Sequence, residues 1–288
     1  EGWVPASPPL RARSDSSPSG ALKESAILMH EPRNRQDHVW LLSGTGEGPT
    51  LAAALLARGF RVSVSVVTDA AAAAYLPLPL THLWVGPLAD ADAIMMRVQN
   101  AGVDRLIDAT HPFATQITAQ LLMAADVLPC PLLRFERPLE ITTDHQVIDR
   151  VEAIPPAALT GRRWLLALGA RHLRSVVPPL RRAGGLLHAR ILPTPQALRQ
   201  AVASGLSDGH LALLRPLPAD CSGQVEAALC RHWGIQAVLC RQSGGVTERC
   251  WHQVCTELGL QLWLLRRPAP PPALKVVHSV EQLLNQLA

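Results

Sequence analysis

The sequence holds few of the side chains on which several enzyme classes depend. Aromatic residues make up 4% of its 288 residues, with a single tyrosine, Tyr75, and only two lysines, Lys23 and Lys275. Pro79, rather than a lysine, stands four residues after Tyr75, which excludes the Tyr-x-x-x-Lys pair of a short-chain dehydrogenase. The patterns G-x-S-x-G, H-E-x-x-H and Walker A are absent too, which disfavours a serine hydrolase, a zinc protease and a P-loop nucleotidase.

Long apolar runs and paired cysteines are missing as well. No uninterrupted apolar stretch approaches the about 18 residues of a membrane-spanning helix, and the first residues lack the layout of a secretory signal. None of the six cysteines forms a C-x-x-C pair, so we expect reduced thiols and no metal site. With no dense Lys/Arg run and no nucleic-acid motif, we expect a cytoplasmic protein that binds neither a membrane nor a nucleic acid.

The net charge is +4, but it is distributed unevenly along the chain. From Arg150 onward there are 16 basic and 7 acidic residues, a net charge of +9, whereas the preceding residues have a net charge of −5. Such asymmetry predicts an anionic ligand for the second half. Because 25 of the 27 basic residues are arginine, codon bias is an alternative source of the excess.

Apolar runs alternate with helical patterns from His38 onward, which is typical of a parallel α/β sheet. The preceding residues, 1–37, are rich in proline and serine and are predicted to be disordered. Prolines and weak periodicity at 136–160 indicate a crossover. We therefore expect two Rossmann-like parallel-sheet α/β domains, 38–150 and 151–288, with a cleft between them. The predicted strands are 38–42, 60–67, 82–85, 105–109, 132–135, 164–168, 186–191, 211–214, 237–240 and 261–265.

A glycine-rich turn, Leu-Leu-Ser-Gly-Thr-Gly-Glu-Gly at 41–48, joins the first predicted strand to a helix. In this order, backbone N–H groups and the positive end of the helix can face a phosphate. The spacing is G-x-G-x-G rather than G-x-G-x-x-G, and a plain tight turn would also favour glycine. The cofactor-binding residues expected here are Gly44, Thr45, Gly46, Glu47 and Gly48.

An acidic residue, Asp69, follows the second predicted strand about 25 residues after Gly44. An acid at this place commonly binds a ribose 2′-hydroxyl, and it would repel a 2′-phosphate. An ordinary surface aspartate in a turn is the alternative.

Four loops with unusual content follow strand ends, where parallel α/β sheets bind their ligands. They span 43–49, 108–114, 169–173 and 241–245. In the second of them, Asp108 ends a strand, and His111 is restrained by Pro112. Because a histidine can titrate near neutral pH or donate to an anion, His111 is the candidate catalytic residue. A helix cap with a neighbouring imidazole is the alternative.

Basic residues lie at or near several strand ends, and guanidinium groups suit carboxylates. They are Arg134, Arg137, Arg171, His172 and Arg190. Each could equally be a solvated surface residue. The turn Ser243-Gly244-Gly245 resembles a second anion-binding turn.

Taken together, these motifs resemble the precorrin-6A reductase family of cobalamin biosynthesis, which includes the cobalt-precorrin form. They occur in the family's order and cover roughly residues 38–288. The matching segments are LSGTGEG at 42–48, DATHPFA at 108–114, LRFERP at 133–138, LGARHL at 168–173, ARILPT at 189–194, CRQSGG at 240–245 and RRP at 266–268.

The resemblance implies an NADPH-dependent reductase, an oxidoreductase acting on a CH-CH group, that converts precorrin-6A or its cobalt form to the 6B form. Its substrate is a tetrapyrrole with many carboxylates, held between the domains, and other corrin-pathway enzymes are possible partners. Besides the glycine turn, we expect the cofactor to contact Thr68, Asp108, His111 and Pro112. We expect the substrate to contact Phe113, Ala114, Arg134, Arg137, Arg171, His172, Arg190, Arg241, Ser243, Gly244 and Gly245.

The sequence departs from the family pattern at four places. Ser43 replaces a usual glycine, Arg241 replaces a usual lysine, Trp251 stands where a second lysine is common, and Asp69 fits NADPH poorly. Two other classes also remain open: a non-catalytic NAD(P)-binding sensor and an S-adenosylmethionine-dependent methyltransferase, whose glycine turn and strand-2 acid can look alike.

Overall fold

A computed structural model describes residues 37–140, 142, 144–215 and 223–287. The expected disordered tail, 1–37, lies outside the described residues except for Asp37. Among the described residues, no helix has both the length and the apolar character needed to cross a membrane.

The first sheet is parallel, with the strand order β12-β5-β4-β1-β2-β3. The order along the sheet reverses between β1 and β4, which makes this boundary the switch point of a Rossmann-like sheet. The strands are β1 (His38–Ser43), β2 (Arg61–Val66), β3 (His82–Val85), β4 (Arg105–Ala109), β5 (Leu132–Phe135) and β12 (Lys275–Val277). The helices are α1 (Gly48–Ala57), α2 (Asp69–Ala72), α3 (Ala91–Ala101), α4 (Thr115–Val127) and α10 (Val280–Leu287). We call this sheet and its helices the first lobe.

The second sheet is also parallel, with the order β6-β11-β10-β7-β8-β9. Its switch point lies between β7 and β10, so both lobes have the same arrangement. The strands are β6 (Gln146–Ile148), β7 (Arg163–Ala167), β8 (Leu186–Ile191), β9 (Leu211–Leu213), β10 (Ala237–Arg241) and β11 (Gln261–Leu265). The helices are α5 (Pro156–Leu159), α6 (Ala170–Arg182), α7 (Pro195–Val202), α8 (Gln224–Trp233) and α9 (Val246–Leu258). This is the second lobe, and the expected α/β fold class is confirmed.

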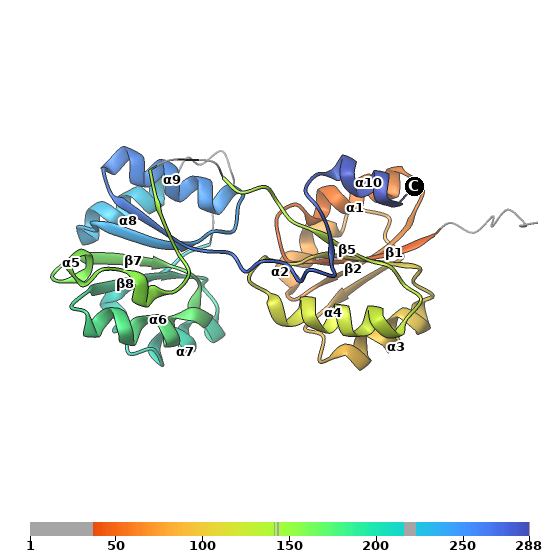
Figure 1. Cartoon of the computed structure of the whole chain (residues 1–288), viewed down its shortest axis with the longest axis horizontal. Coiled ribbons are helices and arrows are strands. Elements are labelled where there is room, and N and C mark those ends of the chain that lie inside the picture. Colours follow the sequence, from red (N-terminus) through yellow and green to blue (C-terminus); the bar gives the residue numbers. More distant parts are fainter. Residues whose placement is uncertain (1–36, 141, 143, 216–222, 288) are drawn as a thin grey trace, which may run out of the picture. The chain divides into compact units, whose positions relative to one another are not determined.

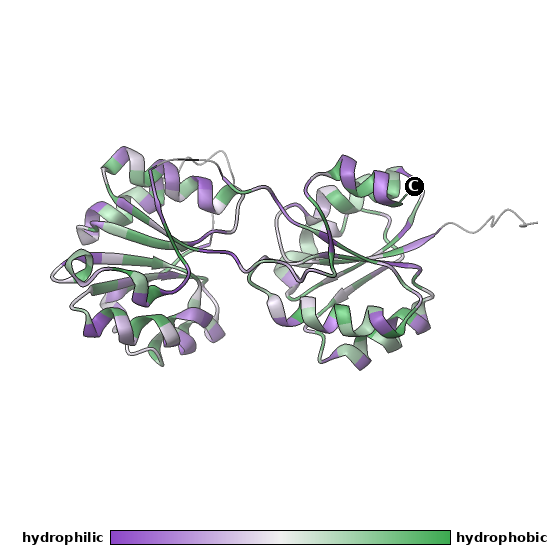
Figure 2. Cartoon of the chain, in the orientation of Figure 1, coloured by the Kyte–Doolittle hydropathy of each residue, from purple (hydrophilic) through white to green (hydrophobic). Residues whose placement is uncertain are grey.

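Helices cover both faces of each sheet (Figure 1). In β1, Val39 and Leu41 pack in one cluster with residues of α1 and α10. Trp40 and Leu42 point the other way, into a cluster with α3 and α4. Strands buried on both faces read as continuous apolar runs, and Figure 2 shows the central strands as mostly hydrophobic ribbon. This burial explains why the apolar runs were good predictors of the strands.

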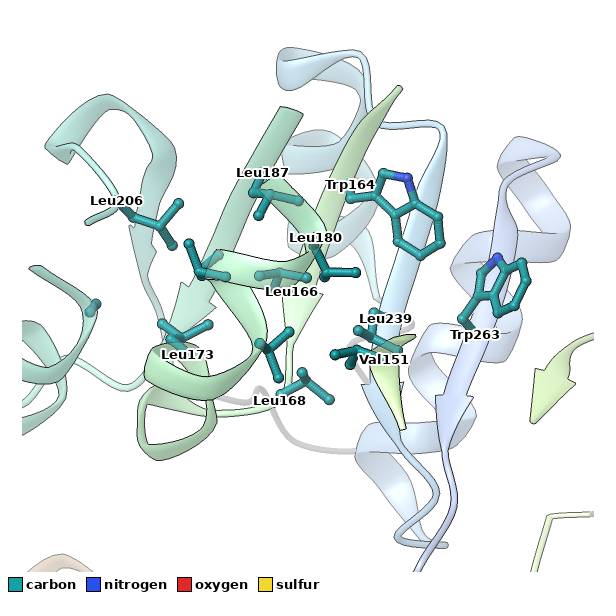
Figure 3. Close-up of a cluster of buried hydrophobic side chains, with 14 of the residues drawn as sticks. Val151, Trp164, Leu166, Leu168, Leu173, Leu180, Leu187, Leu206, Leu239 and Trp263 are labelled. Atoms are coloured by element: carbon teal, nitrogen blue, oxygen red, sulfur yellow. The ribbon is translucent and has the colours of Figure 1, made fainter. Parts of the chain in front are cut away.

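The second lobe has the same two-sided core. Leu166 of β7 packs on the side of α6 and α7, whereas the neighbouring Leu165 packs on the side of α8 and α9. On the first of these sides, the ring of Trp164 lies 5.8 Å from that of Trp263 on β11 (Figure 3). The two large indoles fill space in the core on this side of the sheet.

Sheet membership departs in two places from the expected division at residue 150. The short strand β6 precedes residue 150 but pairs with β11 of the second lobe. The chain then returns at its end, where β12 pairs with β5 of the first lobe. In addition, α6 begins at Ala170, where a loop was expected over 169–173, because Gly169 at φ 84° lets the chain turn directly into the helix.

Candidate functional site

A pocket of about 490 Å³ is lined by residues at and beyond the strand ends of both lobes, including the first turns of α9. From the first lobe, the glycine turn and His111 contribute to its wall. The second lobe contributes Arg190 within β8, Leu192 just after β8, and Arg241 at the end of β10. The expected strand-end loops therefore meet at one cavity, which is the position that the two switch points favour for a ligand.

The glycine turn is held close to the loop after β4. Gly44 N–H donates to the carbonyl of Ala109 across 3.3 Å. A Cβ atom at Gly44 would lie 3.2 Å from the backbone nitrogen of His111, which is tighter than an ordinary contact. Glycine therefore lets the two loops approach each other closely at this position.

Gly48 packs against a hydrogen bond between Tyr75 and Ser43, and this bond gives a role to Ser43, which replaces a usual glycine of the family. The hydroxyl of Tyr75 donates to Ser43 Oγ across 2.6 Å, and both side chains are buried. A Cβ atom at Gly48 would overlap both of these oxygens. Ser43 thus anchors the segment after β2 beneath the glycine turn, and Gly48 has a packing role in the first turn of α1.

Replacing Gly48 by alanine is expected to lower the free energy of unfolding by about 1–3 kcal/mol, the usual cost of overpacking. The added methyl group must displace Tyr75 or Ser43. Gly46→Ala is the matched control, because a Cβ there meets nothing within 4 Å. Urea denaturation of both variants measures the difference. Equal stability of the two variants would contradict the packing role.

Three consecutive amides of the turn are free to bind a ligand. The N–H groups of Thr45, Gly46 and Glu47 donate to no acceptor within the described part of the chain. Glu47 could repel a phosphate, but its carboxylate lies 3.2 Å from the guanidinium of Arg137, which offsets its charge. The turn therefore fits the diphosphate of a dinucleotide, with donors from backbone rather than from side chains.

Asp108 and Arg134, expected at the cofactor and the substrate, are instead paired with each other inside the protein. Their exposed fractions are 0% and 2%, and Arg134 Nη1 lies 2.7 Å from Asp108 Oδ1. Thr110 and Thr118 donate their hydroxyls to the same carboxylate, both across 2.6 Å. These interactions fix the start of the 108–114 loop. This geometry gives the pair a positioning role rather than direct contact with a ligand.

His111 faces the pocket as a neutral imidazole. Burial, reinforced by the nearby cations Arg241 and Arg137, lowers the pKa of His111 to about 3. The backbone N–H of Phe113 donates to Nδ1 across 3.2 Å, so the ring proton is on Nε2. His111 can therefore donate a hydrogen bond from Nε2. The sequence had suggested that its imidazole could titrate near neutral pH, but with a pKa of about 3 it does not.

The lowered pKa of His111 predicts a contribution to acid sensitivity. Between its ordinary value of 6.5 and about 3, the unfolded chain binds more protons at this residue than the folded chain does. Stability due to the neutral ring is therefore present above pH 6.5 and is lost as the pH falls through this window.

The variant His111→Gln should lose less stability than the wild type between about pH 6.5 and pH 4. Urea unfolding measured along a pH series tests this expectation. His232→Gln, which changes an exposed histidine of α8, serves as the control. If the free energy of unfolding falls with pH equally in the wild type and in His111→Gln, the role of His111 in acid sensitivity is contradicted.

Arg241 lines the pocket without a counter-ion in the described part of the chain. Among the residues that the structure describes, its side chain has no hydrogen-bond or ion-pair partner, and its guanidinium carbon lies 5.3 Å from the ring centre of Phe113. Burial lowers the pKa of Arg241 to about 10, so it stays charged at neutral pH. The ring of His172 lies 6.1 Å from that of Phe113. The pocket thus offers a charge that can pair with a ligand carboxylate.

The turn Ser243-Gly244-Gly245 is not the free anion-binding turn that the sequence suggested. Gly244 N–H donates to Glu248 across 2.5 Å, and Gly245 N–H donates to Glu140 across 3.0 Å. Arg137 also donates to the carbonyl of Gly244, and a Cβ at Gly245 would overlap its guanidinium. The protein's own carboxylates therefore occupy these donors. The glycines allow Arg137 to approach the turn.

The remaining predicted residues are divided between the pocket and its surroundings. Arg190 lines the pocket and is partly neutralised by Glu226, 3.4 Å away. Arg171 is exposed on α6, and Thr68 caps α2 through the N–H of Ala71. Pro112 is buried, and Ala114 donates its N–H to the carbonyl of His111. These last two residues shape the loop around His111.

Sequence reasoning missed two residues that hold the site together. Tyr75 attracted attention only as an isolated tyrosine, and nothing in the sequence reveals its bond to Ser43. Glu248 lies three residues after Gly245, the N-cap of α9. A glutamate at this spacing often accepts a hydrogen bond from the start of its helix, so this signal was present in the sequence.

The fold and the site define a Rossmann-like α/β protein with two parallel sheets whose switch points share one pocket. The family model described as "Precorrin-6x reductase CbiJ/CobK" matches residues 38–288. The chain belongs to this family. Membership confirms the expected enzyme class, an oxidoreductase of cobalamin biosynthesis that acts on a CH-CH group.

Individual relatives agree with this assignment. The chain is 35% identical over 254 residues to the cobalt-precorrin-6A reductase of a Synechocystis strain, covering 85% of this chain and 94% of that protein. It is 30% identical over 247 residues to the precorrin-6A reductase of Rhodococcus erythropolis, covering 84% and 94%. A solved structure of CobK precorrin-6A reductase has a TM-score of 0.67 at 24% identity, covering 88% of this chain and 96% of that one, and supports the fold.

Proposed function

We propose that the chain reduces a macrocycle of the precorrin-6A type, metal-free or with cobalt, to its 6B form. Relatives from the family are named for these two substrates. The hydride donor is a reduced nicotinamide dinucleotide, and NADPH is the form that the family resemblance implies. The observation that carries the proposal is the shared pocket, where the turn's amides and Arg241 have no partner among the described residues.

The reduced nicotinamide, when bound, supplies the hydride, and the protein positions both reactants. The amides of Thr45, Gly46 and Glu47 would hold the diphosphate, and Arg137 would keep the charge of Glu47 from opposing it. His111 adds a neutral hydrogen-bond donor to the pocket wall.

The second lobe provides both charge and apolar surface for the macrocycle. Arg241 and Arg190 line the pocket and suit the carboxylates of an anionic tetrapyrrole. Leu192 and Val246 line it too, although they are 49% and 41% exposed. Apolar side chains left open beside a pocket suit the ring of such a substrate.

Deuterium transfer tests the proposed reaction directly. The purified chain is mixed with precorrin-6A or cobalt-precorrin-6A and with NADPH or NADH deuterated at the transferred position. We expect the nicotinamide absorbance to fall and the product to gain one deuterium by mass spectrometry. Nucleotide binding without turnover of either macrocycle would contradict the reductase assignment and favour a sensor. Tight binding of S-adenosylmethionine, with methyl transfer, would favour a methyltransferase.

A further inference from the structure

The segment after β2 lies beside the glycine turn, where a Rossmann-like sheet receives the adenosine ribose of a dinucleotide. Strand β2 is the direct neighbour of β1, with Leu42 opposite Ser65. The hydrogen bond from Tyr75 to Ser43 fixes the far end of the segment beneath the turn. Residues 67–75 are therefore held at the ribose position by both of their ends.

Asp69 is the only charged residue at 67–75, and the other charged side chains between Arg61 and Arg97 are negative as well. No lysine or arginine occurs between Arg61 and Arg97, whereas Asp69, Asp90 and Asp92 all lie in that interval. Asp69 is exposed in the first turn of α2, directly after β2. In the described ranges of the chain, its carboxylate has no ion pair or hydrogen bond. It is free to accept hydrogen bonds from a ligand.

The other basic residues described in the first lobe are occupied or lie elsewhere. Arg97 lies over the ring of Trp84, 4.8 Å from its centre, Arg134 pairs with Asp108, and Arg137 pairs with Glu47. The rest lie where α1 ends or where strands begin, at the edge opposite the carboxyl ends. They are Arg58, Arg61, Arg105 and Lys275. No cation among them is available to a phosphate on the ribose.

We infer that Asp69 makes the nucleotide site select NADH over NADPH. The ribose hydroxyls of NADH can donate to the Asp69 carboxylate. The 2′-phosphate of NADPH would instead stand beside a carboxylate with no cation to offset either charge. The residues present thus fit the dinucleotide diphosphate but not the 2′-phosphate. This inference rests on the proposed function and departs from the NADPH that the family resemblance implies.

Direct binding measurements test the selectivity apart from catalysis. The full chain is titrated with NADH and with NADPH, and quenching of tryptophan fluorescence gives each Kd. We expect NADH to bind at least about tenfold more tightly, which corresponds to about 1.4 kcal/mol. Equal affinities, or tighter binding of NADPH, would overturn the inference. NADPH-dependent turnover would leave the proposed function standing in that case, whereas binding of neither nucleotide would count against both.

Variants at position 69 locate the cause. Asp69→Asn should weaken NADH binding about tenfold, because a charged hydrogen-bond acceptor is lost, and Asp69→Arg should make NADPH the tighter ligand. Asp92→Asn is the matched control, since Asp92 is likewise an exposed acid in the first turn of a helix, α3. Circular dichroism confirms that each variant is folded. An unchanged NADH/NADPH ratio in folded Asp69→Asn and Asp69→Arg would overturn the role of this residue.

Discussion

Replacing Arg241 by alanine is expected to raise the KM for the macrocycle about tenfold to a hundredfold, with no comparable change in the Kd of the dinucleotide. The guanidinium lies in the pocket without a counter-ion among the described residues, and it remains charged at neutral pH. A charge-assisted hydrogen bond to a substrate carboxylate is worth about 1.5–3 kcal/mol, which gives this range. Steady-state kinetics and a separate nucleotide titration measure the two effects.

Two further variants separate charge from geometry. Arg241→Lys restores the residue that the family usually has, and it should give an intermediate KM because the ammonium lacks the two-pronged donor. Arg171→Ala is the control, since Arg171 is exposed on α6 and does not line the pocket. An equal loss of macrocycle and dinucleotide affinity in Arg241→Ala would contradict the assignment of the second lobe to the substrate.

Much of the fold was predictable because its central strands are buried on both faces. The apolar runs at 132–135 and 186–191 coincide with β5 and β8. The edge strands β6 and β12 were not predicted, because each has only three residues and lies within or just after a proline-containing stretch, 136–160 or 268–272. Their sheet membership depends on which edge is open in three dimensions, and this is why the chain crosses back to the first lobe at its end.

The position of the site was more predictable than the roles of its residues. Parallel sheets collect their ligands at the carboxyl ends of the strands, so the loops after β1 and β10 were recognisable. The pairing of Asp108 with Arg134 follows from the register of β4 and β5, where the two residues are direct partners. The closing of the turn at Gly245 depends on Glu140, 105 residues away. Sequence patterns of local spacing contain neither fact.

The same register predicts the largest effect on stability. Asp108→Ala is expected to lower the free energy of unfolding by about 3–5 kcal/mol, because it leaves the guanidinium of the buried Arg134 without its nearest carboxylate. Denaturant unfolding measures the loss. Asp149→Ala is the matched control, because the Asp149–Arg266 pair is 77% and 56% exposed and should contribute less than about 1 kcal/mol.

A double variant distinguishes the cost of an unpaired charge from a loss of packing. Asp108→Ala combined with Arg134→Met removes both charges, and it should recover part of the stability that the single variant loses. Recovery is expected to be incomplete, because Thr110 and Thr118 also lose the carboxylate that accepts their hydroxyls. A single variant no less stable than Asp149→Ala would contradict the buried pair as the support of the 108–114 loop. If it is the support, the loosened loop should also weaken dinucleotide binding, since Gly44 packs against the backbone of His111 in that loop.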